Sequence, residues 1–106
     1  LTAPASYFTQ PGVALANPAG TAANIQRIAI QEYIAAYPDG LRGWNLWRRT
    51  GWPVLTPAPD ALNSSGQIPQ RYTYGQQSYG SNAANTAAAA SAIGGDTQDT
   101  KVWWAQ

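Results

Sequence analysis

The stretch of sequence that decides the fold is Gly43-Trp44-Asn45-Leu46-Trp47-Arg48-Arg49-Thr50-Gly51-Trp52-Pro53. It combines apolar residues at helical spacing with two adjacent arginines, which the dipole of a helix favours in its last turn. Gly51 suits the left-handed position that follows a helix, and Pro53 forbids continuation of the helix. The stretch therefore predicts a helix over residues 41–50 that ends at Gly51.

The three tryptophans of this stretch, Trp44, Trp47 and Trp52, allow two interpretations. Their rings could stack on the faces of a sugar. Alternatively, they could pack the helix against the rest of the protein, which is the commoner use of an aromatic stripe. The helical spacing of Trp44 and Trp47 favours packing. Trp52 follows the end of the helix, and we therefore keep it as a candidate ligand-binding residue.

Arg48 and Arg49 also have two possible roles. Their guanidinium groups could bind an acidic sugar or a phosphate in a bidentate manner. Alternatively, they stabilise the end of the helix and pair with an internal carboxylate, for which Glu32, Asp39 and a residue outside this sequence are candidates. We favour this structural role. Gly43, inside the same helix, costs about 1 kcal/mol relative to alanine and indicates a close contact between helices.

Two further helices are predicted on either side of this one. Apolar residues recur at every fourth position after Thr21, a suitable N-cap, which predicts a helix over 21–37. An alanine-rich run predicts another helix over 82–93, ended by Gly94-Gly95. The fold class is therefore mostly α with long irregular segments. These segments are rich in proline and glycine and cover residues 1–20, 51–81 and 94–106.

The irregular segment 51–81 holds most of the candidate binding residues, because ligands are often bound by loops. Tyr72 and Tyr74 alternate, so an extended backbone would place both rings on one side. Arg71 could bind an acidic ligand or pair with an internal carboxylate. The candidate ligand-binding residues are Trp52, Arg71, Tyr72, Tyr74 and Tyr79.

The composition limits both the fold and the partners. Leu, Ile, Val and Phe supply 16 of 106 residues, about 15%, which is below the roughly 20% that a chain needs for a core of its own. We therefore expect the chain to be a fragment that packs against the rest of its own polypeptide. The net charge is only +1 and no basic stripe is present, so we predict no nucleic-acid partner.

The residues available for chemistry argue against catalysis. The chain has no His and no Cys, which removes the usual general bases, nucleophiles and soft metal ligands. Asp60, Asp96 and Asp99 match no known calcium-binding loop, and Asp96 is more simply a turn former after Gly94-Gly95. We therefore predict a protein that is not an enzyme, without catalytic residues, metal site or cofactor.

Four blocks of sequence occur together between residues 26 and 104. They are Gln31-Glu32-Tyr33-Ile34-Ala35 with Pro38-Asp39-Gly40; Trp44 with Trp47-Arg48-Arg49-Thr50-Gly51-Trp52-Pro53; Ile68-Pro69-Gln70-Arg71 with Tyr74, Tyr79 and Asn82; and Gly95-Asp96 with Lys101-Val102-Trp103-Trp104. Together they resemble the C-terminal end of the SusD/RagB family of outer-membrane nutrient-binding lipoproteins. Gln70, Gly75 and Ser78 depart from the Ile-Pro-Arg-Arg and Tyr-Pro-x-x-Glu patterns of that family.

The resemblance implies a fold and a setting. Residues 1–106 would form a single C-terminal fragment of a helical SusD-like domain, with tetratricopeptide-like helices in the part that precedes this sequence. The protein would lie on the cell-surface face of the outer membrane, lipid-anchored through an N-terminal region absent from this sequence. Trp103 and Trp104 would dock the C-terminal end, because two exposed indoles favour aggregation. The structural signature is Trp44, Trp47, Arg48, Arg49, Gly51, Pro53, Trp103 and Trp104.

Three functions remain open for the chain itself. The resemblance implies non-catalytic capture of a nutrient, most simply a glycan, and its delivery to a TonB-dependent outer-membrane transporter. The chain could instead be a scaffold segment with no ligand contact of its own, or a free-standing carbohydrate-binding module. We favour nutrient binding.

Overall fold

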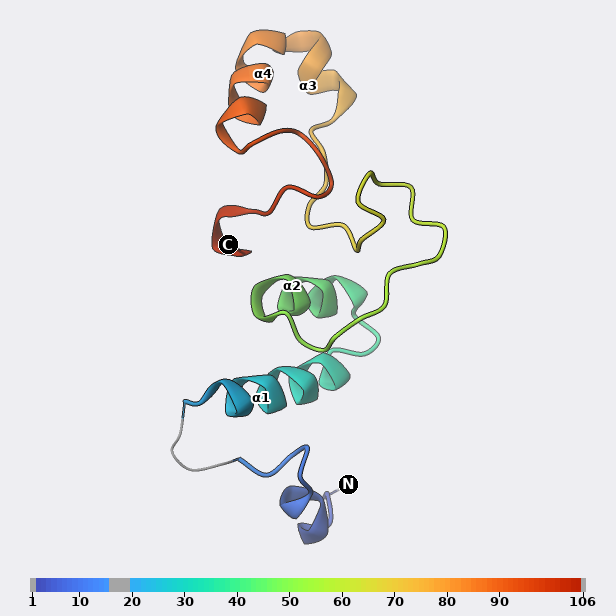
Figure 1. Cartoon of the computed structure of the whole chain (residues 1–106), viewed down its shortest axis with the longest axis vertical. Coiled ribbons are helices and arrows are strands. Elements are labelled where there is room, and N and C mark those ends of the chain that lie inside the picture. The colour runs from blue at the N-terminus through green and yellow to red at the C-terminus, as the bar shows by residue number, and fades with distance from the viewer. Residues whose placement is uncertain (1, 16–19, 106) are drawn as a thin grey trace. The chain divides into compact units, whose positions relative to one another are not determined.

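The computed structural model describes residues 2–15 and 20–105, and the regular structure within these ranges is entirely helical (Figure 1). Its elements are the 3₁₀ helix η1 (Ala5–Thr9), the α-helices α1 (Ala22–Ala35), α2 (Gly40–Thr50), α3 (Gln76–Ser81) and α4 (Ala83–Ala92), and the 3₁₀ helix η2 (Trp103–Ala105). The predicted fold class, mostly α with long irregular segments, is confirmed. The chain divides into two compact units, Leu1–Leu55 and Thr56–Gln106. That residues 1–106 form a single fragment of a larger domain stays a prediction.

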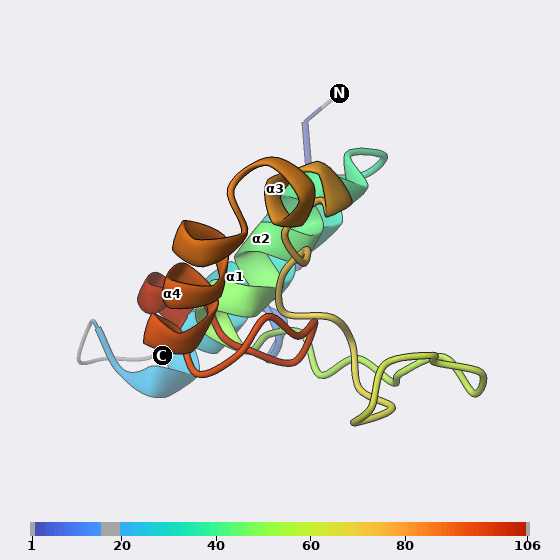
Figure 2. The ribbon, with the colours of Figure 1, turned by 90° about the horizontal axis from the view of Figure 1, so that it is seen from above.

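Helices α1 and α2 form the body of the first unit, where they lie side by side and run in opposite directions (Figures 1 and 2). The Thr21 hydroxyl accepts a hydrogen bond from Asn24 N at 3.4 Å, and the Asp39 carboxylate accepts one from Arg42 N at 3.0 Å. Each cap satisfies an N–H group that the first turn of a helix leaves without a partner. The start of each helix agrees with the sequence pattern to within one residue.

Both helices end where the sequence opposes their continuation. Helix α1 ends at Ala35, two residues before the predicted limit, because Pro38 disfavours helical backbone in the residue before it. Helix α2 ends at Thr50, and Gly51 takes the left-handed conformation, with φ of 73°. The Gly51 N–H donates to Trp47 O at 2.7 Å, which satisfies one of the last carbonyl groups of the helix.

Gly43 on α2 lies against the aromatic ring of Tyr33 on α1. A Cβ atom at Gly43 would be only 3.2 Å from Tyr33 Cε2, closer than most side chains tolerate. The missing side chain therefore lets the two helices approach, and the predicted close contact at Gly43 is confirmed. Ala29, Ala36 and Leu46 are the buried apolar residues of this unit among those described.

Helices α3 and α4 contact each other in the second unit (Figure 1). The buried Thr86 hydroxyl lies 3.0 Å from Ser78 O and 2.8 Å from Asn82 O, so it links α4 to α3. Gly94 and Gly95 have φ angles of 84° and 122°, and they turn the chain after α4 as their sequence predicted.

The prediction that residues 51–81 are entirely irregular is wrong for Gln76–Ser81, which form α3. Gly75 does not break this segment; it occupies the N-cap position with extended backbone, at φ −65° and ψ 148°. Gly80 lies inside the helix, where glycine costs about 1 kcal/mol but is tolerated. Contact with α4 stabilises a helix that is too short to persist alone.

Two 3₁₀ turns also occur where the sequence predicted irregular backbone, η1 within 1–20 and η2 within 94–106. Each is too short to produce a periodic pattern in the sequence. Element η1 is held to α1 by a hydrogen bond from the Tyr7 hydroxyl to Gln31 Oε1. The predictions for residues 1, 16–19 and 106 lie outside the described residues.

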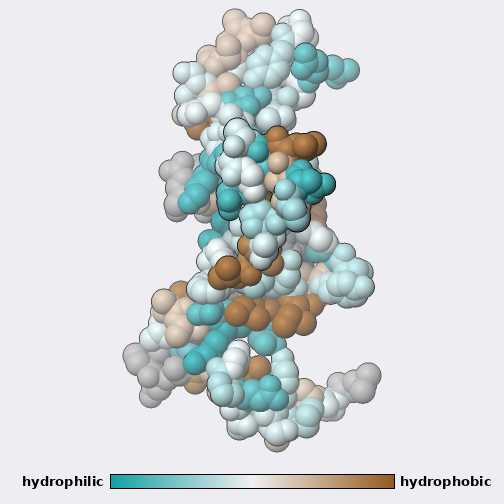
Figure 3. Space-filling model, turned by 45° about the vertical axis from the view of Figure 1, so that its right-hand side comes forward, coloured by the Kyte–Doolittle hydropathy of each residue, from teal (hydrophilic) through white to brown (hydrophobic). Residues whose placement is uncertain are grey.

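Apolar side chains interrupt the hydrophilic surface of the described residues (Figure 3). Ile25, Ile28 and Ile34 of α1 are each more than half exposed, as is Leu41 at the start of α2. The helices thus leave apolar surface uncovered by the part of the chain that the structure describes. None of the described helices is both long enough and apolar enough to cross a membrane.

Candidate functional site

Asp96, in the loop after α4, organises a polar cluster in the second unit. Its carboxylate accepts hydrogen bonds from Arg71 Nη1 at 2.6 Å, the Tyr79 hydroxyl at 2.7 Å and Tyr74 N at 3.0 Å. The side chains of Arg71 and Asp96 are each only 10% exposed. We call Arg71, Tyr74, Tyr79 and Asp96 the Asp96 cluster. It brings together three of the five candidate binding residues around a carboxylate that we interpreted from the sequence as a turn former.

The local backbone explains why these groups meet. Gly94 and Gly95 reverse the chain in a conformation that other residues rarely adopt, and Asp96 follows them directly. The Gln70 N–H donates to Gln98 O at 2.7 Å, which holds the segment before Arg71 against the same loop. The positions of the cluster residues are therefore set by backbone contacts as well as by the ion pair.

Hydrogen bonding sets the charge of the cluster at neutral pH. The hydrogen bond from Tyr79 has the largest effect and lowers the pKa of Asp96, and the donors of Arg71 and Tyr74 act in the same direction. The same hydrogen bond raises the pKa of the Tyr79 hydroxyl. Asp96 is therefore an anion that balances the Arg71 guanidinium, while Tyr79 is neutral.

Asp99 forms a second link between the loop after α4 and the irregular segment. It accepts hydrogen bonds from Asn63 Nδ2 at 2.5 Å, Ser64 Oγ at 2.9 Å and Ser65 N at 3.3 Å, and also from the Ser65 hydroxyl. The hydroxyls of Ser65 and Ser64 are the main reason that the pKa of Asp99 is lowered. The two aspartates thus attach the irregular segment before α3 to the loop after α4 through side-chain hydrogen bonds.

A pocket of about 360 Å³ lies beside the Asp96 cluster. The Arg71 guanidinium carbon lies 4.9 Å from the centroid of the Tyr74 ring, so these two side chains form one wall. Trp103 is 83% exposed, and its indole offers an open aromatic surface. The pocket is lined by Arg71, Tyr74, Ala92, Ile93, Lys101, Val102 and Trp103.

The other two candidate binding residues do not belong to this cluster. Tyr72 is 76% exposed, whereas Tyr74, which contacts Arg71, is 36% exposed. Trp52 belongs to the first unit, where the Thr50 hydroxyl lies 3.1 Å from its backbone nitrogen and 3.2 Å from its carbonyl oxygen. That any of the five candidates contacts a ligand stays a prediction.

The signature residues of α2 contact one another. The Arg48 guanidinium carbon lies 3.6 Å from the centroid of the Trp44 ring, and Arg48 Nη2 donates a hydrogen bond to Asn45 Oδ1. Trp47 and Pro53 are half-buried. These contacts favour the structural interpretation of the tryptophan-arginine stretch.

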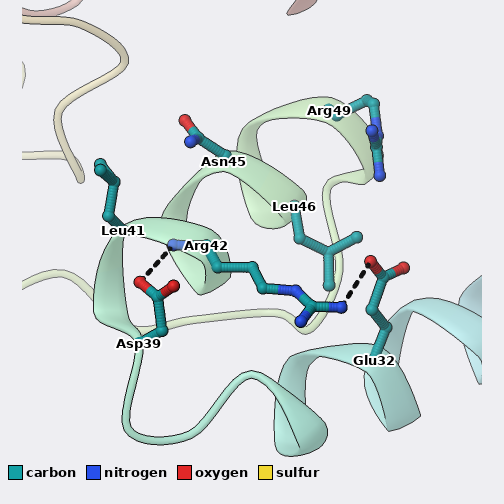
Figure 4. A pocket seen from close by; sticks show the side chains of 7 residues that line it. All are labelled: Glu32, Asp39, Leu41, Arg42, Asn45, Leu46 and Arg49. Carbon is teal, nitrogen blue, oxygen red and sulfur yellow. Dashed lines mark hydrogen bonds and ion pairs between the residues drawn. The ribbon is translucent and has the colours of Figure 1, made fainter.

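The internal carboxylates contact an arginine that the sequence did not single out. Glu32 Oε1 lies 3.9 Å from Arg42 Nη2, and the Asp39 carboxylate accepts a hydrogen bond from the backbone N–H of Arg42 (Figure 4). Glu32, Asp39 and Arg42 line a pocket of about 380 Å³ in the first unit, and Arg49 lines it too. The sequence suggested these carboxylates as partners of Arg48 or Arg49, whereas the contacts in the structure join both of them to Arg42.

The expectation that Trp103 docks the C-terminal end is wrong within the described residues, because Trp103 is 83% exposed. Successive side chains of a 3₁₀ turn point in directions about 120° apart, so one short turn cannot bury all of them. Ala105 takes the buried position in η2, and Trp104 is 37% exposed. Exposure of Trp103 could not be read from the sequence.

No group of three or more His, Cys, Asp or Glu residues lies together in the described ranges 2–15 and 20–105. Asp96 and Asp99, which we considered for calcium, direct their oxygens to donors of the protein itself. In the sequence, the signal for Asp96 as the centre of a cluster was its position directly after two glycines, in the block Gly95-Asp96.

Comparison with known proteins identifies one family. A family model described as SusD-like, Susd and RagB outer membrane lipoprotein, matches residues 9–105, which include both aspartates and the tryptophan-arginine stretch. No curated protein and no solved structure matches the chain significantly.

Proposed function

This chain belongs to the SusD/RagB family of outer-membrane lipoproteins, and from this premise we propose that it takes part in the non-catalytic capture of a nutrient at the cell surface. The proposed nutrient is a glycan, which the protein delivers to a TonB-dependent outer-membrane transporter. The proposed anchor is a lipid attached to a region that precedes this sequence.

The pocket beside the Asp96 cluster is the observation that carries the proposal. Its rim presents the exposed indole of Trp103 and the ring of Tyr74. Aromatic faces suit the apolar faces of sugar rings, while polar atoms around them can bind hydroxyl groups. The wall made by Ala92, Ile93 and Val102 supplies the apolar surface that most ligand pockets have.

The predicted binding residues have different roles in this proposal. Tyr74 contacts the glycan directly, and exposed Tyr72 provides a further contact. Trp52 lies in the first unit and is a separate candidate for ligand contact. Arg71 and Tyr79 act as positioning residues, because Arg71 Nη1 and the Tyr79 hydroxyl already donate to Asp96.

The charge state of the aspartates supports binding without catalysis. Glycoside hydrolysis needs a carboxylic acid that stays protonated near neutral pH, which requires a raised pKa. Hydrogen bonds lower the pKa of both Asp96 and Asp99 instead. Neither residue therefore suits the role of general acid.

Binding of the full-length protein to soluble α-glucan, β-glucan, xylan, pectin and casein peptides tests the proposal, with calorimetry as the readout. We expect Trp103→Ala and Tyr74→Ala to weaken binding of the preferred glycan by about tenfold, in line with the loss of a stacked ring. The control is Tyr37→Ala, which removes an aromatic side chain that is 87% exposed on the turn after α1.

The same experiment separates the alternatives. The segment is a scaffold if none of four variants alters glycan affinity while all of them stay folded. These variants are Trp52→Ala, Tyr72→Ala, Tyr79→Ala and Trp103→Ala. The hydrogen bonds that the Asp96 carboxylate accepts within the protein itself favour this second candidate. Binding of casein peptides in place of every glycan would contradict the proposed ligand class.

A further inference from the structure

We propose that the pocket beside the Asp96 cluster selects a glycan that carries carboxylate or sulfate groups, and that Lys101 binds the anion. The inference rests on the proposed function, because it takes Trp103 as the surface that holds a sugar ring. It adds the substrate class and a specificity-determining residue.

The charges that line the pocket do not cancel. Arg71 and Lys101 are its basic residues, and Arg71 is balanced by Asp96 at 2.6 Å. Within the described ranges, Lys101 forms no ion pair, and no acidic residue lines the pocket. The pocket therefore carries the uncompensated positive charge of the exposed Lys101 side chain.

The nearest acidic residue in the sequence does not neutralise this charge at the pocket wall. Asp99 lies two positions before Lys101, but its carboxylate is bound by Asn63, Ser64 and Ser65 and, within the described ranges, forms no ion pair with Lys101. Asp99 is absent from the pocket lining, whereas Lys101 is part of it. An anion in the pocket would therefore meet the ammonium group of Lys101 before any carboxylate of the described residues.

The placement of Lys101 beside an aromatic surface favours an anion that is carried on a sugar ring. Lys101 and Trp103 line the same pocket and are separated by Val102 alone. A sugar ring on the indole would bring a substituent of that ring toward the ammonium group. Lysine acts as a point charge without the fixed fork of arginine, so it accommodates either a carboxylate or a sulfate. A neutral glycan forms no ion pair with this charge.

Matched ligands that differ only in charge test the inference on the full-length protein. The probes are oligogalacturonate with its methyl ester, and a sulfated galactan oligosaccharide with its desulfated form. We expect at least one charged form to bind about three- to tenfold more tightly than its neutral partner at low salt, as a partly exposed charge-assisted contact predicts. Added NaCl should reduce this preference.

Four variants separate the inference from the proposed function. Lys101→Gln should abolish the preference for the charged form, Lys101→Arg should retain it, and Arg42→Gln, which removes an exposed cation of the first unit, should leave it unchanged. Trp103→Ala should weaken binding of both the charged and the neutral form.

If Trp103→Ala weakens binding but Lys101→Gln does not alter the preference, or if no preference exists, the inference is wrong and the proposed function stands. If Trp103→Ala has no effect on any bound glycan, or if no probe binds, both the inference and this binding site are overturned.

Discussion

Arg71 and Asp96 form an ion pair in which Arg71 Nη1 lies 2.6 Å from Asp96 Oδ1, with both side chains 10% exposed. The two residues are 25 positions apart, so the pair joins the segment before α3 to the loop after α4. An ion pair with so little exposure does not guarantee stability, but removal of one partner leaves the other charge without compensation.

Loss of either partner should therefore destabilise the protein, and loss of both should cost less than the sum of the two single losses. We expect Asp96→Asn and Arg71→Met each to lower the midpoint of thermal unfolding, and the double variant to lower it by less than the sum of the two shifts. Thermal unfolding in a double-mutant cycle measures this coupling. Asp60→Asn, at an exposed aspartate, is the control and should have little effect. Additive shifts would show that the pair contributes no coupling.

The stability of the second unit should fall in acid. Asp96 and Asp99 have folded-state pKa values below the unfolded value of about 3.9, so they favour the folded state while ionised. Their contribution is complete above about pH 5 and is lost as pH decreases through the lowered folded-state pKa values. Urea unfolding as a function of pH measures the effect, and Asp99→Asn should make the acidic decrease shallower. An unchanged slope in both Asp99→Asn and Asp96→Asn would contradict this prediction.

Tyr79 should contribute a separate effect in alkali. Its folded-state pKa is raised by the hydrogen bond to Asp96, so the neutral hydroxyl favours the folded state below about pH 10. This contribution is lost as pH rises through the raised folded-state pKa. We expect Tyr79→Phe to flatten the alkaline decrease in unfolding free energy, whereas Tyr37→Phe, at an exposed tyrosine, should not.

The helices of the first unit could be predicted because their signals are local. Thr21, Asp39 and Gly51 lie next to the helix ends that they determine, and each has the conformation or the hydrogen bond that its type favours. Helix α3 was missed because its stability depends on contact with α4, which neither Gly75 nor Gly80 reveals.

Only part of the candidate site could be predicted, because the contacts that assemble it join residues that are distant in the sequence. Arg71, Tyr74 and Tyr79 could be selected as polar or aromatic residues of a loop, but their common partner Asp96 is 17 to 25 positions away. A single sequence carries no record of such a distant contact. Trp103 was misjudged because its exposure depends on how η2 orients successive side chains.

The hydroxyl of Thr86 should matter more than its methyl group. It lies 3.0 Å from Ser78 O and 2.8 Å from Asn82 O and is buried, so Thr86→Val keeps the shape and removes the hydrogen bond. We expect a loss of about 1 kcal/mol in unfolding free energy and faster hydrogen exchange in α3. Thr86→Ser should retain more stability than Thr86→Val. The matched control is Thr73→Val on the exposed surface, and an equal loss there would contradict the assignment.

The contact between Gly43 and Tyr33 should limit the size of the residue at position 43. A Cβ atom there would lie 3.2 Å from Tyr33 Cε2, so Gly43→Val should overpack the α1–α2 contact and cost about 1–3 kcal/mol. Gly43→Ala should be nearly neutral, because the gain in helix propensity of about 1 kcal/mol offsets the crowding. Urea unfolding measures both changes. Gly40→Val is the control, since a Cβ atom at Gly40 would meet nothing within 4 Å. If Gly43→Val proves as harmless as Gly40→Val, or if Tyr33→Leu fails to rescue it, the close approach of the two helices does not depend on the missing side chain.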